Sequence, residues 1–211
     1  MSGKFITLEG TEGVGKSTNL AVIAQWLEMH SIPYIQTREP GGTPLAEQLR
    51  ELLLSPREEK VDPKAELLMV FAARAQHLAE VVKPALARGE WVLCDRFTDA
   101  TFAYQGAGRR LPKSLIEQLE QLVQEGLQPD CTVLLDLCPS VGLARAQERG
   151  ELDRFEAEAQ SFFERVREAY LQRAAADPKR FHIINADQSI EAVAADITKA
   201  LDNMLPGAAH G

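Results

Sequence analysis

Short apolar segments alternate with longer amphipathic segments along most of the chain. The apolar segments are rich in β-branched and aromatic residues, which is typical of buried strands. They cover residues 4–9, 33–37, 91–95, 131–137 and 181–185. Between them, apolar residues three and four positions apart predict helices. These cover residues 17–30, 44–54, 63–88, 97–104, 112–124, 139–149, 155–176 and 189–204. This alternation favours an α/β fold with a five-stranded parallel sheet flanked by helices.

The first predicted strand runs directly into a glycine-rich segment that precedes a helix. Residues 10–17 read Gly-Thr-Glu-Gly-Val-Gly-Lys-Ser, which fits the phosphate-binding P-loop pattern. Glycines allow main-chain N–H groups to turn inward, and together with the helix N-terminus these donors suit a polyphosphate. We expect Lys16 to reach the β- and γ-phosphates of a nucleotide and Ser17 to ligate Mg²⁺. The residues expected to bind the phosphate donor, which the resemblance described below implies is ATP, are Gly10, Thr11, Glu12, Gly13, Val14, Gly15, Lys16, Ser17 and Thr18.

The third predicted strand ends in an acidic residue, Asp95. Four apolar residues followed by Asp form the arrangement in which a carboxylate holds Mg²⁺, directly or through water. The pattern alone is a weak signal, and the P-loop upstream strengthens it. In a parallel sheet, ligands bind beyond the carboxyl ends of the strands. Glu9, Arg38 and Asp95 are expected at that edge.

Phe71 and Arg74 lie on an otherwise apolar stripe of the helix predicted over residues 63–88. Being three positions apart they are neighbours, and they could offer a ring for stacking and a planar set of donors. The alternative is that Phe71 belongs to the core and Arg74 pairs with a buried carboxylate. The pattern alone favours this second interpretation.

Several arginines lie outside the P-loop, in numbers greater than one nucleoside triphosphate needs. They are Arg38 in a Gly- and Pro-rich turn, Arg96 after Asp95, and Arg149 and Arg154 in a polar stretch between two helices. The polar stretch is either an ordinary solvated loop or a mobile loop that carries arginines to a phosphate. We infer a second, phosphate-bearing substrate. Transfer between phosphates requires alignment and charge neutralisation rather than a strong base.

Composition limits the remaining classes. The 211 residues suggest one domain, over residues 1–206, with a frayed tail at 207–211. A net charge of −8 argues against general nucleic-acid binding. The three cysteines, Cys94, Cys131 and Cys138, lie in or beside apolar strands and are expected to be buried, reduced thiols, as in a cytoplasmic protein. No signal peptide or membrane span is predicted.

Five motifs, in this order, resemble those of the bacterial thymidylate kinases over nearly the whole chain. They are residues 5–13 (FITLEGTEG), 37–43 (TREPGGT), 71–74 (FAAR), 95–97 (DRF) and 149–154 (RGELDR). The resemblance implies a P-loop NTPase fold with a short lid at about residues 142–155. It also implies phosphorylation of dTMP to dTDP by ATP with Mg²⁺, in a homodimer.

The resemblance further implies roles for individual residues. Arg38, Arg50 and Arg96 would bind the acceptor phosphate. Phe71 would stack on thymine, Arg74 would bond its O4, and Thr101 and Gln105 would read its N3 edge. Glu9 and Tyr104 would lie near the deoxyribose. Asp95 would support both Mg²⁺ and the geometry of Arg96. Arg149 and Arg154 would close over the transferred phosphate, and Arg145 would flank adenine.

The chain departs from many family members at two positions. Glu12 stands in the P-loop where some members carry a catalytic arginine, which matches the type that has its arginines in the lid. Val70 stands four residues before Arg74, where many members carry the stacking phenylalanine.

Two other functions remain possible from the sequence. One is another P-loop nucleotide or deoxynucleoside kinase. The other is a GTPase switch or a regulatory ATP-binding module. A small GTPase is disfavoured because the chain has no Asn-Lys-x-Asp motif after a strand.

Overall fold

The computed structural model describes residues 3–149, without the side chain of Arg149, and residues 153–205. It contains one sheet in which each adjacent pair of strands is parallel, in the order β2-β3-β1-β4-β5. The strands are β1 (Phe5–Gly10), β2 (Tyr34–Arg38), β3 (Trp91–Asp95), β4 (Cys131–Asp136) and β5 (Phe181–Asn185). The predicted α/β class and the five strands are therefore confirmed.

Helices fill the connections between the strands, and one more helix follows the last strand. They are α1 (Lys16–Met29), α2 (Pro44–Leu54), α3 (Pro63–His77), α4 (Lys83–Ala87), α5 (Thr98–Thr101), α6 (Lys113–Gln124), α7 (Pro139–Arg149), α8 (Gln160–Ala176) and α9 (Ile190–Asp202). Proline opens α2, α3 and α7, since its missing N–H is not needed in a first helical turn. The side chain of Asp62 accepts hydrogen bonds from the backbone N–H groups of Lys64 and Ala65, which caps the N-terminus of α3.

Two predicted helices are interrupted by wider turns. The helix expected over residues 63–88 contains a π-helical segment, η1 (Leu78–Val82), between α3 and α4. Pro84 follows this segment, and because it lacks an N–H it cannot complete the regular α-helical bonding. A second π-helical segment, η2 (Phe102–Gly108), follows α5. The helix expected from residue 155 begins later, at Gln160.

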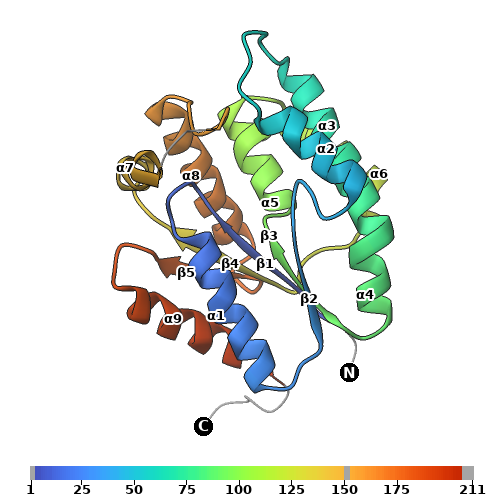
Figure 1. Ribbon diagram of the computed structural model, residues 1–211, viewed down its shortest axis with the longest axis vertical. Coiled ribbons are helices and arrows are strands. Elements are labelled where there is room, and N and C mark those ends of the chain that lie inside the picture. The colour runs from blue at the N-terminus through green and yellow to red at the C-terminus, as the bar shows by residue number, and fades with distance from the viewer. Residues whose placement is uncertain (1–2, 150–152, 206–211) are drawn as a thin grey trace.

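Helices cover both faces of the sheet, as Figure 1 shows with α1 and α9 lying side by side on the face toward the viewer. Successive residues of a strand point to opposite faces. Ile6 and Leu8 accordingly pack with Ile23 of α1 and Ile197 of α9, whereas Phe5 packs in a separate core cluster that includes η1 and β3. The sheet is thus buried from both sides.

The carboxyl ends of the neighbouring strands β2, β3 and β1 lie in register. Asp95 of β3 is aligned with Leu8 of β1 and with Arg38 of β2. This arrangement brings the segments that follow each strand to one edge, as predicted.

The three cysteines differ in their exposure. Cys94 and Cys131 are buried free thiols, but Cys138 is exposed, so the expectation of a buried thiol was wrong there. Cys138 follows the last buried residue of its segment and precedes α7, where the chain leaves the sheet. No helix in the described ranges is both long and apolar enough to cross a bilayer.

Candidate active site

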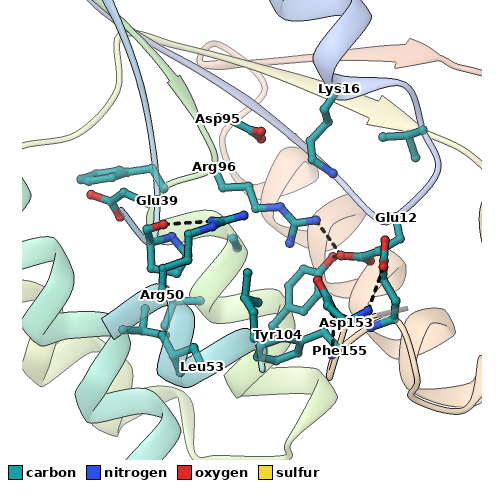
Figure 2. Close-up of a pocket in the computed structure, with 18 of the residues that line it drawn as sticks. Glu12, Lys16, Glu39, Arg50, Leu53, Asp95, Arg96, Tyr104, Asp153 and Phe155 are labelled. Atoms are coloured by element: carbon teal, nitrogen blue, oxygen red, sulfur yellow. Dashed lines mark hydrogen bonds and ion pairs between the residues drawn. The ribbon is translucent and has the colours of Figure 1, made fainter. Parts of the chain in front are cut away.

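A cleft of about 470 Å³ opens at the carboxyl edge of the sheet. Its walls come from segments far apart in the sequence: the P-loop, the end of β3, α2, α3, α5 with η2, and the segment of Asp153, Phe155 and Glu156. Figure 2 shows Lys16 and Asp95 on one side of this cleft and Arg50 and Leu53 on the other. The cleft therefore joins the predicted phosphate loop to the predicted second-substrate residues.

The P-loop adopts the backbone that its glycines permit. Gly13 and Gly15 have φ values of 70° and 86°, in the left-handed region that side chains disfavour. A Cβ on Gly13 would also lie 2.0 Å from the carbonyl oxygen of Gly142 in α7, so this position has no room for one. The loop thereby leaves the N-terminus of α1 open to an anion.

Lys16 lies within the P-loop and bends back over it. Its Nζ donates to the carbonyl oxygens of Gly10, at 3.3 Å, and Thr11, at 2.9 Å. Burial, together with the positive charge of Arg96, lowers the pKa of Lys16 to about 8. Polyphosphate at the loop would offset both effects, because it brings negative charge to the ammonium group.

Arg96 connects the end of β3 to the P-loop. Its Nη2 donates to Oε1 of Glu12 at 2.7 Å, and its guanidinium stacks 4.7 Å from the centre of the Tyr104 ring (Figure 2). The Tyr104 hydroxyl donates to the same carboxylate. Burial favours the neutral acid, but Arg96 and Lys16 hold the pKa of Glu12 below its ordinary value. The Glu12 carboxylate is thus bound to the Arg96 guanidinium, and an incoming phosphate could take the place of this carboxylate.

Asp95 lies beside this pair and has a free oxygen. Its Oδ1 is buried and makes no hydrogen bond within the described part of the chain. Residues 3–149 and 153–205 contain no group of three or more His, Cys, Asp or Glu side chains placed to hold a metal ion by themselves. Mg²⁺ bound to a nucleotide needs only one or two protein oxygens besides the phosphates. The orphaned oxygen of Asp95 and the hydroxyl of Ser17, which lines the same cleft, fit that requirement.

Arg74 enters the cleft from α3 and is almost fully buried. Its Nε donates to Oε2 of Glu39 at 2.7 Å, and its Nη2 donates to Oγ1 of Thr101 at 2.9 Å. His77 Nδ1 lies 2.9 Å from the other oxygen of Glu39. The remaining nitrogen of Arg74, Nη1, is buried and has no partner among the described residues. A buried donor without a partner is costly unless a ligand satisfies it.

Val70 and Phe71 take different positions. Val70 lines the cleft, one helical turn before Arg74. The Phe71 ring is 2% exposed, packs with Leu67 and lies under the Arg74 guanidinium, 4.8 Å from ring centre to Cζ. Phe71 does not line the cleft, because a three-residue step on this helix turns it into the core. This is the arrangement favoured by the pattern alone.

Gln105 of η2 also lines the cleft and is 3% exposed. Its Nε2 donates to Oε1 of Glu66 at 2.9 Å. Tyr104, the residue before Gln105, and Thr101, about one helical turn before it, line the same wall of the cleft. The structure therefore brings Arg74, Thr101, Tyr104 and Gln105 together, as the sequence resemblance implies.

The other residues expected at the acceptor differ in their positions. Arg50 lines the cleft and donates from Nη1 to the carbonyl oxygen of Pro40 at 2.9 Å. Arg38 is exposed outside the cleft lining and pairs with Glu47 at 2.8 Å. Glu9 is fully buried behind the lining, where it accepts from the Phe97 N–H and the Tyr170 hydroxyl. Burial and the nearby Asp99 raise the pKa of Glu9 to about 8.

The predicted lid arginines are only partly described. Arg154 does not line the cleft: its Nη2 lies 2.7 Å from Oε2 of Glu66, and its Nε donates to the carbonyl oxygen of Leu53. The side chain of Arg149 and residues 150–152 lie outside the described residues. Arg145 is exposed and lies 3.9 Å from Asp187, in the loop after β5.

Sequence reasoning did not single out two buried glutamates, Glu39 and Glu66. Each receives an arginine from the expected site, Arg74 and Arg154 respectively. Glu66 carried one signal: it stands at four-residue spacing with Val70 and Arg74, as a charged residue on an apolar stripe.

Comparisons with known proteins agree with this geometry. The sequence profile of the family described as thymidylate kinase matches residues 8–197. A thymidylate kinase from Teredinibacter turnerae is 64% identical over 205 residues, covering 97% of this chain and 100% of that protein. One from Pseudomonas putida is 61% identical, covering 98% and 97%. A crystal structure of thymidylate kinase from Ehrlichia chaffeensis superposes with a TM-score of 0.77 at 32% identity, covering 95% and 100%.

Proposed function

The chain belongs to the thymidylate kinase family, and we propose that its cleft transfers the γ-phosphoryl group of ATP to dTMP, giving dTDP. One observation carries the choice of acceptor. The cleft that holds the P-loop is also lined by Gln105 and by Arg74, whose buried Nη1 has no hydrogen-bond partner among the described residues. A pyrimidine with a carbonyl at position 4 would satisfy that donor.

The P-loop binds the donor nucleotide. Its N–H groups and Lys16 hold the phosphates, and Ser17 and Asp95 hold Mg²⁺, which neutralises charge on them when bound. The remaining P-loop residues, Gly10 to Gly15 and Thr18, form the wall of this site. Arg145, with the loop after β5, flanks adenine.

The opposite part of the cleft binds dTMP. Arg96 exchanges Glu12 for the acceptor phosphate, with Arg50 beside it and Arg38 reaching in from the rim. Val70 provides the apolar surface for the ring, and Phe71 supports Arg74 from below. Thr101 and Gln105 face the N3 edge, and Tyr104 lies near the sugar, with Glu9 behind it. Charge built up during transfer is stabilised by Lys16 and Arg96, joined by Arg149 and Arg154 of a lid at about residues 142–155.

Family membership supports three further parts of the proposal, namely the domain bounds, the oligomeric state and the cellular location. The protein acts as one kinase domain over residues 1–206 in a cytoplasmic homodimer, with residues 207–211 as a tail. These assignments are part of the proposal. Analytical ultracentrifugation tests the dimer, and a single monomeric species at micromolar concentration would overturn it.

A coupled assay of ADP release tests the reaction. ATP should be consumed quickly only when dTMP is present, and dUMP should react more slowly because the lost methyl contact is worth about 1–3 kcal/mol. Faster turnover of dCMP, UMP or thymidine would identify another nucleotide or nucleoside kinase. Equal ATP consumption with and without dTMP would exclude transfer to dTMP altogether.

A further inference from the structure

Glu66 is a buried carboxylate behind the wall of the cleft. It is 0% exposed and stands on α3 at four-residue spacing with Val70 and Arg74. Three side chains converge on it. They are the Gln105 amide at 2.9 Å, Arg109 at 3.1 Å and Arg154 at 2.7 Å. The bond to Glu66 holds the Gln105 amide in place, because the amide would lose a buried partner by turning.

We propose that Glu66 is a positioning residue that sets base specificity by fixing the orientation of the Gln105 side-chain amide. The inference rests on the proposed reaction and names a residue behind the base site. Glu66 does not line the cleft, so it acts through Gln105 rather than by touching the base.

The orientation follows from donor and acceptor chemistry. A carboxylate accepts hydrogen bonds and does not donate them, whereas an amide has one donor end and one acceptor end. Because Nε2 of Gln105 is committed to Glu66, Oε1 is the end left for a ligand. Gln105 therefore presents an acceptor to the cleft.

Arg74 presents the complementary group. Two of its nitrogens are held by Glu39 and Thr101, and the third, Nη1, is buried and free among the described residues. A donor from Arg74 and an acceptor from Gln105 match the O4 and N3–H of thymine or uracil. Cytosine reverses both groups, with an amino group at position 4 and a lone pair at N3, and would leave two mispaired contacts.

The test compares Glu66→Gln with the wild type. A glutamine at this position can donate as well as accept, so Gln105 is free to turn its donor end to the ligand. We expect the ratio of kcat/KM for dTMP to kcat/KM for dCMP to fall by at least about tenfold, with a gain for dCMP. An unchanged ratio in a folded variant would overturn the proposal.

A matched control separates positioning from general loosening. Glu158→Gln removes the other carboxylate that binds Arg109, whereas the Gln105 amide bonds to Glu66. The control should keep the wild-type ratio. An equal fall in Glu158→Gln would show that the Arg109 cluster acts on structure alone and would overturn the role of Glu66.

A double variant tests whether Glu66 acts on base specificity through Gln105. In a Gln105→Ala background, Glu66→Gln should cause no further change in the ratio, because the group that Glu66 orients is gone. A further fall of similar size would place the effect elsewhere, for example at Arg154, and would contradict the proposal.

A measurement on the wild type applies even where a variant fails to fold. With ¹⁵N-labelled dTMP, the N3–H proton of the bound base should be protected from exchange, because the acceptor end of Gln105 bonds to it. An N3–H that exchanges freely in the bound state would mean that no acceptor faces it, contrary to the proposal. If the wild type itself prefers dCMP, the proposed reaction fails instead.

Discussion

Nη2 of Arg96 and Oε1 of Glu12 lie 2.7 Å apart, which ties the end of β3 to the P-loop. The fork of a guanidinium can hold Glu12 or an acceptor phosphate with the same geometry. Without a substrate the charge of Arg96 is compensated inside the protein. The same two elements would face each other across the transferred phosphoryl group.

Arg96→Lys should therefore lower kcat/KM for dTMP by about 10², since an ammonium lacks the planar fork and one lost transition-state donor typically costs that much. Steady-state kinetics with varied dTMP measure the effect. Arg88→Lys is the control, because Arg88 is exposed and pairs only with its neighbour Glu90 among the described residues. If kcat/KM for dTMP were the same in Arg96→Lys and in the wild type, Arg96 would have no role in the reaction.

ATP affinity should weaken above about pH 8. Burial and Arg96 lower the pKa of Lys16 to about 8, so the free protein loses the positive charge of Lys16 as the pH rises through that value. ATP phosphates prefer the protonated form, and the dissociation constant should rise by up to about tenfold per pH unit beyond it. Calorimetric titration of ATP between pH 7 and 9.5 checks this, and a flat profile would contradict it.

Substitutions at Val70 and Phe71 should have different effects, one mainly on dTMP binding and the other mainly on the free energy of unfolding. Phe71→Ala should lower the free energy of unfolding by about 3 kcal/mol, because it leaves a cavity in a buried cluster. Val70→Ala should raise KM for dTMP with a smaller loss of stability, since Val70 lines the cleft. Denaturant unfolding and steady-state kinetics on both variants provide the comparison. The reverse pattern would place the Phe71 ring against the base.

Arg154→Ala should lower kcat by a larger factor than it raises KM for dTMP. A lid arginine stabilises charge that develops mainly in the transition state. In this structure Arg154 instead pairs with Glu66, so its contribution requires release from that carboxylate. Rapid-quench and steady-state kinetics measure it, and an unchanged kcat would exclude the role.

Stability should fall as the pH rises from about 5 to 8 because of Glu9. Its pKa is about 8 in the folded protein, with burial as the main cause, against 4.5 in the unfolded chain. Over that range the folded state holds a proton that the unfolded chain has released, so raising the pH favours unfolding. Glu9→Gln should flatten this dependence in urea titrations at pH 5 and 8. An equal slope in the variant would assign the effect to other groups.

Local patterns were enough to predict most of the fold. The bounds of α2, α7 and β5 follow from proline positions and apolar spacing. The π-helical segments were missed because their wider turns keep a helix-like apolar pattern. Residue periodicity does not distinguish them, and only Pro84 hints at the first.

The site was harder to predict at the level of contacts. Lys16 and Asp95 follow from sequence because each ends a strand or begins a helix in a recognisable pattern. The carboxylates that pair with the arginines could not be predicted from the sequence. Glu39 and Arg74, for example, are 35 positions apart and are brought together only by packing of α3 against the loop after β2. Phe71 shows the same limit, since one residue of rotation on a helix decides between cleft and core.

The nitrogen of Arg74 that has no partner among the described residues has a consequence for inhibitor chemistry. A compound lacking phosphate but carrying a cyclic imide, with a carbonyl next to an N–H, would meet both fixed hydrogen-bonding groups of the base pocket at once. Heterocycles that carry an exocyclic amine at that edge would be repelled, whatever their shape. Affinity in a compound series should therefore depend on the order of donor and acceptor along one ring edge more than on ring size.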